Sequence, residues 1–406
     1  MKALFERHLH GDRTIWVVVL LLALVSLLSV YSGGAWLIWR TPGGGLRLLF
    51  KHALMLASGG AIMYVASRLR YTAYSKLSQL LIVVTAGLLL LTLLVGSNVN
   101  GASRWLAVPG LGITFQTSDL AKVVLLVYLA RVLGRHQGEP WTFKAVLLRL
   151  GLPIAVICGL ILPANFSTAA LLGLTCFVLL FIGRVPLKHL ASLVLLAVGA
   201  FLALLLLART KPELLPRAAT WEKRIERWMA GDDGVMTAEE RDADFQANNA
   251  KIAIAVGGLM PNGPGTGTSR NYMPHSESDM IYALIIEEYG SVIGGLGLLL
   301  LYLILFFRAV RIATGCEKRF GSYAAVGLAL SLVLTAFMNM AVSVGMVPVT
   351  GQPLPLVSMG GTSIWFTCLA VGIILSVSRS LAEHAGGSED HPTRKGPAHH
   401  TDAAFA

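Results

Sequence analysis

Three carboxylates accompany one long apolar run of the sequence. In NYMPHSESDMIYALIIEEYG, residues 271–290, Asp279 precedes the run, and Glu287 and Glu288 lie inside it. A charge at the centre of a membrane helix costs roughly 2.5 to 3.5 kcal/mol, so such acids need a reason. A carboxylate at the edge of a helix can stay hydrated, reach an aqueous substrate and take part in acid–base chemistry.

Helical spacing predicts how these acids relate to one another. At about 1.5 Å and 100° per residue, Glu287 would lie roughly 12 Å deeper than Asp279 and about 80° round the helix. Glu288 would lie on nearly the opposite side. We therefore expect Glu287 to share the cavity of Asp279. Spacing alone leaves a second interpretation open, in which Ser278 or Asp279 caps the helix.

A second charged pair lies in FQTSDLAKVVLLVYLA, residues 115–130. Asp119 and Lys122 are three residues apart and share a helix face, so their side chains can pair. One interpretation is an internal salt bridge that only tolerates burial. The other is a polar pocket that opens outward, in which Lys122 meets an anionic group of a substrate.

The composition indicates that lipid surrounds these residues. Hydrophobic residues make up 55% of the 406-residue chain and charged residues 14%, which is too apolar for one soluble core. Apolar runs of about 20 residues can cross a bilayer as helices, and these runs lack the alternation of a membrane barrel. The predicted spans are 14–38, 50–67, 77–97, 115–134, 148–163, 166–183, 187–208, 280–307, 321–345 and 361–378. The expected fold class is an all-α, polytopic membrane protein with ten transmembrane helices.

The distribution of Lys and Arg predicts the orientation. Basic residues favour short cytoplasmic segments, and most of them fall on one side if the amino terminus is inside. We expect both termini in the cytoplasm and one large extracytoplasmic loop, residues 209–279, between spans 7 and 8. WEKRIERWM, residues 221–229, fits either an amphipathic helix at the outer interface or a solvated helix. Residues 1–382 form the membrane domain, and 383–406 are a disordered cytoplasmic tail.

Several site classes are excluded by the sequence. The four cysteines are scattered without a close pair, which supports neither a disulfide framework nor a thiolate metal site. The positive charge follows topology, and no basic run with interleaved aromatic residues indicates nucleic acid. GPGTGTS, residues 263–269, lacks the lysine of a phosphate-binding loop. Its glycines are expected to let the loop turn sharply and bring its backbone close to another group.

Four stretches of the sequence carry a family resemblance. They are NGASRWLAVPG (100–110), FQTSDLAK (115–122), FQANNAKIAIAVGGLMPNGPGTGTSRNYMPHSESDMIYALIIEEYG (245–290) and NMAVSVGMVPVTGQPLPLVSMGGTS (339–363). In this order they resemble the SEDS family of shape, elongation, division and sporulation proteins, most of all its division branch. The amino-terminal GDRTIW (11–16) also favours that branch.

The resemblance implies a peptidoglycan glycosyltransferase of the cytoplasmic (inner) membrane. Family members polymerise lipid II, a disaccharide-pentapeptide on undecaprenyl diphosphate, into glycan strands at the outer face. In this family the Asp of P-x-x-H-T-D-F-I-F is essential, and ESDMIY carries that role onto Asp279. Asp279 is then expected to take the proton from the acceptor 4-hydroxyl.

The leaving diphosphate needs positive charge near it. Lys122, Arg104 and Arg270 are the candidates, and a divalent cation, Mg²⁺ or Mn²⁺, is an alternative carrier of the same work. The identity of any metal ligand is unknown, and no organic cofactor is expected. The family pattern Q-P-S-E-L-x-K appears as QTSDLAK, which matches Gln116, Asp119 and Lys122.

A late family motif is kept from Pro348 to Ser363. It predicts an irregular, protein-covered outer loop, because exposed non-helical backbone is not tolerated in lipid. Ser358 is its candidate for substrate contact. The predicted substrate-binding residues are Arg104, Gln116, Asp119, Lys122, Arg270, Glu287 and Ser358. The chain departs from the family at PANFSTA (163–169), where Asn165 replaces the usual acid, which puts a role for negative charge there in doubt.

The resemblance also implies partners. They are a class B penicillin-binding protein, a transpeptidase whose single span docks on the bundle, and other membrane proteins of the division complex. Two other functions remain open. A lipid II flippase would need polar groups that reach the inner leaflet, whereas the inner half of most spans is featureless. A noncatalytic scaffold would not need Asp279.

Overall fold

The computed structural model describes residues 11–33, 44–99, 102–108, 113–136, 140–210, 238–271 and 278–389. The described part is mainly helical, and a helical segment lies in the described part of each predicted span; residues 34–38 of the first span lie outside the described residues. The segments are α2 (Arg13–Gly33), α4 (Gly44–Arg68), α5 (Tyr71–Val95), α6 (Thr117–Arg135), α7 (Phe143–Val146) continued by η1 (Leu147–Gly151) and α8 (Leu152–Ile161), α9 (Phe166–Ile182), α10 (Leu187–Thr210), α13 (Ile281–Tyr289) continued by η4 (Gly290–Leu296) and α14 (Gly297–Gly315), α15 (Arg319–Ser343), and α16 (Ser363–Glu389).

Eight of these described segments are long and apolar enough to cross a membrane. The two remaining segments are α9, which is apolar but only 17 residues long, and α6, which carries Asp119, Lys122, Arg131 and Arg135. Length and composition therefore support a multi-pass membrane protein. Helix α10 agrees, because almost no residue of its most apolar stretch is buried inside the protein.

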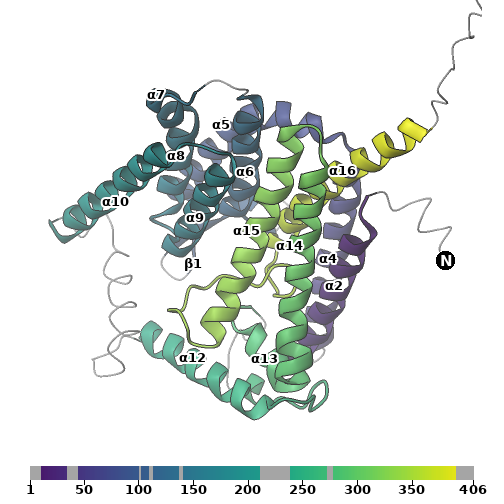
Figure 1. The fold of residues 1–406 in the computed structure, drawn as a ribbon. Helices are drawn as coiled ribbons and strands as arrows, with labels where there is room; N and C mark the ends of the chain where they lie inside the picture. The colour runs from purple at the N-terminus through teal and green to yellow at the C-terminus, as the bar shows by residue number, and fades with distance from the viewer. Residues whose placement is uncertain are drawn as a thin grey trace, which may run out of the picture.

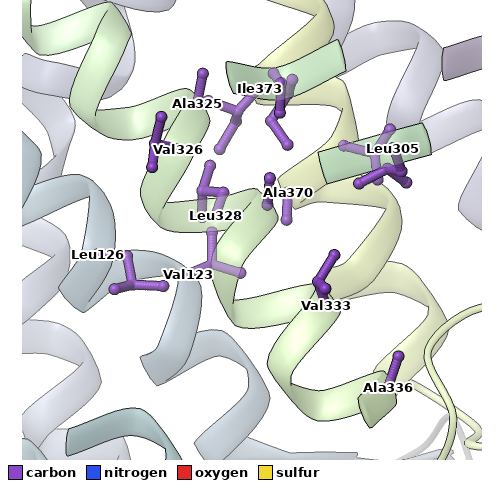
Figure 2. Packing of buried hydrophobic residues seen from close by; sticks show 14 of the residues in the cluster. Val123, Leu126, Leu305, Ala325, Val326, Leu328, Val333, Ala336, Ala370 and Ile373 are labelled. Atoms are coloured by element: carbon purple, nitrogen blue, oxygen red, sulfur yellow. The ribbon is translucent and has the colours of Figure 1, made fainter. Parts of the chain in front are cut away.

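The central helix of the bundle is α15, which contacts α6, α9, α14 and α16. Figure 2 shows apolar side chains of α6, α15 and α16 meeting between these helices. They include Val123, Leu126, Val326, Leu328, Ala370 and Ile373. Because lipid tails are as apolar as leucine, close packing rather than removal from water holds such a core together. This packing fixes the ends of α6 and α15, which carry the polar residues discussed below.

Helices α4 and α16 pack closely along their length. A Cβ added at Gly59 would lie 2.9 Å from the Cys368 Sγ, and one at Gly372 would lie 2.8 Å from the Met63 carbonyl oxygen. A side chain at Gly372 would meet the backbone of α4, so this position accepts only glycine unless the helices move apart, as in other membrane helix pairs that use small residues. At Gly59 the nearest atoms belong to the side chains of Cys368 and Ile364, which can shift. Trp365 Nε1 also donates to Ser58 Oγ across the seam, at 2.8 Å.

Helix α12 (Ala238–Gly257) and a small sheet lie largely outside the predicted spans, and Figure 1 shows α12 at one end of the bundle. Helix α12 lies across this end and packs on α13. A small antiparallel sheet of β1 (Ser97–Val99), β2 (Ala102–Val108) and β3 (Ile113–Gln116) leads into α6, with β2 central. The all-α prediction did not include this sheet.

Two other expectations change. The predicted span 280–307 extends to Gly315 as a broken helix, because Gly290 at φ +73° and the wide turns of η4 interrupt it. Helix α16 continues to Glu389, so the first residues of the predicted tail are helical rather than disordered. The predicted helix 221–229 and residues 390–406 lie outside the described residues.

Candidate active site

Asp279 lies just before α13 and does not cap it. The N-cap is Met280, which has no capping side-chain bond, so the capping interpretation of Asp279 is not what the structure shows. The Asp279 side chain is half-buried, and its Oδ1 accepts a hydrogen bond from Ser278 Oγ at 2.9 Å. A lightly bonded, partly accessible carboxylate is suited to meet a substrate.

The backbone around Asp279 is fixed by α15 and by the loop 348–362. Asn339 Nδ2 donates to the Asp279 carbonyl at 2.9 Å and to the Gln352 carbonyl at 2.7 Å. Ser358 Oγ donates to the Ser278 carbonyl at 2.6 Å and accepts from Leu354 N at 2.8 Å.

The same loop reaches the carboxylate directly. Gly351, at φ +63°, lies so near that an added Cβ would be 3.4 Å from Asp279 Oδ2. Gln352 Nε2 ties the loop to Thr168 Oγ1 of α9 at 2.6 Å. The irregular loop predicted from the late motif is present, and it forms one wall of the site.

The Asp119–Lys122 pair lies beside this loop in the first turns of α6. Lys122 Nζ is 2.6 Å from Asp119 Oδ1, as predicted from the spacing, and Asp119 is only 4% exposed. The pair lines a small cavity of about 40 Å³ together with Pro353, Pro355 and Ser363 of the late motif. Asp119 Oδ2 has no hydrogen-bond partner among the described residues. The cavity thus joins two of the predicted motifs.

Gln116 ends β3 and begins α6. Its backbone N–H donates to Thr362 Oγ1 at 3.3 Å, and its Nε2 donates to Ser118 Oγ at 3.0 Å. These bonds join the QTSDLAK motif to the late loop. Arg104 lies in β2, and its side chain is outside the described part of the chain.

Glu287 is held by a different part of the chain. Its Oε1 accepts from Thr268 N at 2.9 Å, Ser269 N at 3.1 Å and Ser269 Oγ at 3.0 Å, and the residue is 2% exposed. Gly267 lies against it, where a Cβ would be 3.0 Å from Oε2. The glycine-rich loop therefore turns to bring its backbone onto this carboxylate. We expected Glu287 to share the cavity of Asp279, but its carboxylate bonds to the glycine-rich loop instead. A role of Glu287 in substrate binding stays a prediction.

Arg270 belongs to the same loop assembly. Its Nη1 donates to Ser32 Oγ at 2.8 Å and lies 3.8 Å from Glu288 Oε1, and its Nη2 donates to the Gly265 carbonyl at 2.6 Å. Ser32 Oγ also donates to Glu288 Oε1. These contacts fasten the loop to the end of α2. Phosphate contact by Arg270 stays a prediction.

Several positioning residues were not predicted. Asn339, Gln352 and Thr168 join α15, the late loop and α9, and Asn165 caps α9 by accepting from Thr168 N at 3.1 Å. The capping role explains how an amide serves where the family has an acid, because both side chains accept the same bond. An isolated amide within an apolar run, such as Asn339, is the signal that would have pointed to this network.

The described side chains alone do not form a metal-binding site. Among the described residues, no group of three or more His, Cys, Asp or Glu lies close enough to hold an ion. Among the described residues of the site, Asp279 is the one carboxylate that is partly accessible. A divalent cation would need substrate phosphate oxygens as most of its ligands, so its presence stays a prediction.

Known proteins resemble the chain over nearly its whole length. A family model described as "Cell cycle protein", for FtsW, RodA and SpoVE, matches residues 12–383. The stage V sporulation protein E of Bacillus subtilis is 30% identical over 376 residues, covering 91% of this chain and 97% of the relative. A probable peptidoglycan glycosyltransferase FtsW of Coxiella burnetii is 31% identical over 372 residues, covering 89% and 95%.

Solved structures agree. A chain from a study of polymerization and crosslinking by a peptidoglycan synthase complex matches with a TM-score of 0.67 and 26% identity, covering 92% of this chain and 99% of the other. A mutant of the rod shape determining protein RodA of Thermus thermophilus matches with a TM-score of 0.64 and 25% identity, covering 92% and 98%. The chain is therefore a member of the FtsW/RodA/SpoVE family of cell cycle proteins, the SEDS family.

Proposed function

We propose that this protein is a peptidoglycan glycosyltransferase that polymerises lipid II at the outer face of the cytoplasmic membrane during cell division. The observation that supports this best is the position of Asp279. Its half-buried carboxylate has one side-chain bond, while its backbone is held by Asn339 and the late loop. The names of its relatives, peptidoglycan glycosyltransferases among them, favour the same activity.

In the proposed reaction Asp279 removes the proton of the acceptor 4-hydroxyl as this oxygen attacks C1 of the donor sugar. The bond from C1 to the diphosphate breaks, and the diphosphate leaves with its electron pair. Lys122, Arg104 and Arg270 are the proposed cations for its growing charge. In the proposed topology all ten helical segments cross the membrane, both termini are cytoplasmic, and Asp279 lies on the outer side.

A protein partner is also proposed from the comparison with known structures. One structural match comes from a study of a peptidoglycan synthase complex. We expect this chain to act with a class B penicillin-binding protein and with other membrane proteins of division. Co-purification with the endogenous transpeptidases would identify the partner and the branch of the family.

The test is polymerisation of labelled lipid II by the purified protein in liposomes. Asp279→Asn should lower the rate about 100-fold or more, because a positioned base contributes at least that much. Glu317→Gln, which removes an exposed carboxylate at the other end of the bundle, should leave the rate unchanged. Undiminished polymerisation by a folded Asp279→Asn protein would reject the assignment. Full complementation of a deletion by Asp279→Ala would favour the scaffold function instead.

A lipid II flippase remains the second candidate because of one observation. The sequence predicted featureless inner halves of the spans, but the structure buries Arg131 near the end of α6 that lies opposite Asp279, and cavities surround it. A vesicle assay for lipid II movement, run beside the polymerisation assay, separates the two activities. Movement without polymerisation would favour the flippase.

A further inference from the structure

A large basic cavity lies at the end of the bundle remote from Asp279. Its volume is about 660 Å³, and it is formed by the start of α5, the end of α6 and the connection from α14 to α15. Asn339, which binds the Asp279 backbone, and Arg319, which lines the cavity, are 20 residues apart on α15. At about 1.5 Å per residue this separation is roughly 30 Å, the thickness of a bilayer core.

The lining of this cavity is strongly cationic. Its charged residues are Lys76, Arg131, Arg135, Glu317, Lys318 and Arg319. Five cations thus face one carboxylate. Among the described residues none of these five is in an ion pair. Cations that serve only to orient a membrane protein can project freely into water, and they need not converge on a concavity.

Arg131 is the least expected of these residues. It is 5% exposed, and its guanidinium donates to the Ser75 carbonyl, to Ser75 Oγ at 3.2 Å and to Gln79 Oε1 at 2.8 Å. All three acceptors are neutral, so its charge is not compensated by any described residue. A buried, uncompensated cation at the wall of a cavity favours an anionic occupant.

Two further cavities adjoin the first. One of about 490 Å³ shares Arg131 and Arg135 and adds Arg149, and one of about 520 Å³ shares Arg319 and adds Arg184. Trp141 lines both of them, and its ring stacks on His136 with centroids 3.6 Å apart. Tryptophan at a helix end is typical of the headgroup level of a membrane.

Apolar surface continues from these cavities along the outside of the bundle. Ile182 lines one cavity and is 40% exposed, and Leu77 and Leu80 of α5 are exposed next to Lys76. A soluble anion would gain nothing from such surface, whereas the acyl chain of a lipid would cover it. The combination of clustered cations with adjoining exposed apolar surface matches an anionic lipid.

We infer that the group of cavities around Arg131, Arg135 and Arg319 binds the phosphate headgroup of an anionic phospholipid from the inner leaflet. The inference does not depend on the proposed polymerase activity. It assigns the inner cations a ligand, and it assigns the inner cavities to bilayer lipid rather than to a translocated substrate.

The test measures lipid retained by the full chain in detergent, counted by native mass spectrometry. The probes are phosphatidylglycerol and phosphatidylcholine with the same acyl chains. The variant is Lys76→Gln/Arg135→Gln/Arg319→Gln, in which all three side chains are exposed, so that folding is kept. The matched control is Lys188→Gln/Arg311→Gln, two exposed cations of the same end that line none of these cavities.

The wild type should retain phosphatidylglycerol in preference to phosphatidylcholine. Each cation near an anionic lipid contributes about fivefold to binding, so the triple variant should bind on the order of 100-fold more weakly. The double control should bind like the wild type. Equal binding by the triple variant, an equal loss in the control, or no preference between the two lipids would overturn the inference.

Two competitors distinguish the source of the phosphate. Inorganic phosphate at millimolar concentration should not displace the phospholipid, because it lacks the apolar contacts. Undecaprenyl diphosphate should not be preferred over phosphatidylglycerol. Displacement by phosphate would show a site for a soluble anion, and preference for the polyprenyl diphosphate would show a substrate site. Either result would overturn the assignment to bilayer lipid.

Discussion

Asp279 and Glu287 lie eight residues apart at the same end of the molecule, yet their carboxylates are held in opposite ways. Asp279 is half-buried and has one side-chain bond, to Ser278, while its backbone is fixed from outside. Glu287 is buried and accepts from two backbone amides and two hydroxyls. The difference indicates that one carboxylate is free for chemistry and that the other holds the 262–270 loop in place.

The largest effect on stability is expected at Glu287. Glu287→Ala leaves four donors of Thr268 and Ser269 without an acceptor, at about 1 kcal/mol each, so the free energy of unfolding should fall by about 3 to 5 kcal/mol. This loss of stability can be measured by thermal unfolding in detergent, in which the fraction of protein that stays monodisperse is followed with temperature. Glu287→Gln keeps an acceptor and should lose roughly half as much, because charge-assisted bonds are about twice as strong.

The Gln variant also sharpens the comparison. Its activity per folded molecule should stay near that of the wild type, whereas Asp279→Asn should be inactive but as stable as the wild type. An inactive, stable Glu287→Gln protein would show that both carboxylates take part in the reaction.

A third carboxylate, Asp119, is intermediate between these two, because it is buried like Glu287 but lines a cavity beside the loop that contacts Asp279. Asp119→Asn removes the partner of Lys122 and should destabilise the protein by about 3 kcal/mol, the low end for a buried pair, because Lys122 is partly exposed. Asp119→Leu/Lys122→Met replaces both charges and should recover most of the stability in the same unfolding assay. If that double variant also kept its polymerisation rate, the pair would be structural only.

The smallest of these effects is expected at Ser358. Ser358→Ala removes the donor to the Ser278 carbonyl and leaves the Leu354 amide unpaired, which should cost about 1 to 2 kcal/mol. Because Ser278 adjoins Asp279, the rate should fall more than the fraction of folded protein does. A rate that follows the folded fraction alone would show that Ser358 does not position Asp279.

The sequence predicted what depends on neighbours in the chain. Apolar runs located the helices, and three-residue spacing located the Asp119–Lys122 pair, because both follow from local geometry. The prediction for Glu287 rested on a continuous helix from residue 279, but α13 begins at Ile281. Its carboxylate is also taken by a loop 19 residues earlier in the chain, a contact that no local pattern shows.

The sheet and the inner cavities were missed for related reasons. Strands β1 to β3 are short and lie in the connection between α5 and α6. The alternation of polar and apolar residues in them is therefore too brief to detect. The inner cations were assigned to topology alone, since their convergence depends on how α5, α6 and α15 pack. Asn339 and Gln352 show the same limit, because each bonds to partners from other elements.

The glycine seam between α4 and α16 restricts how the proposed lipid substrate could enter the bundle. A lateral gate must open where two helices can separate, and at Gly372 the backbone of α4 is too close for even one methyl group. We therefore expect entry through another side of the bundle. Oxidation of a Gly59→Cys variant should join the new thiol to native Cys368 and leave polymerisation unchanged. If oxidation instead stopped polymerisation and a reductant restored it, the gate would lie at this seam.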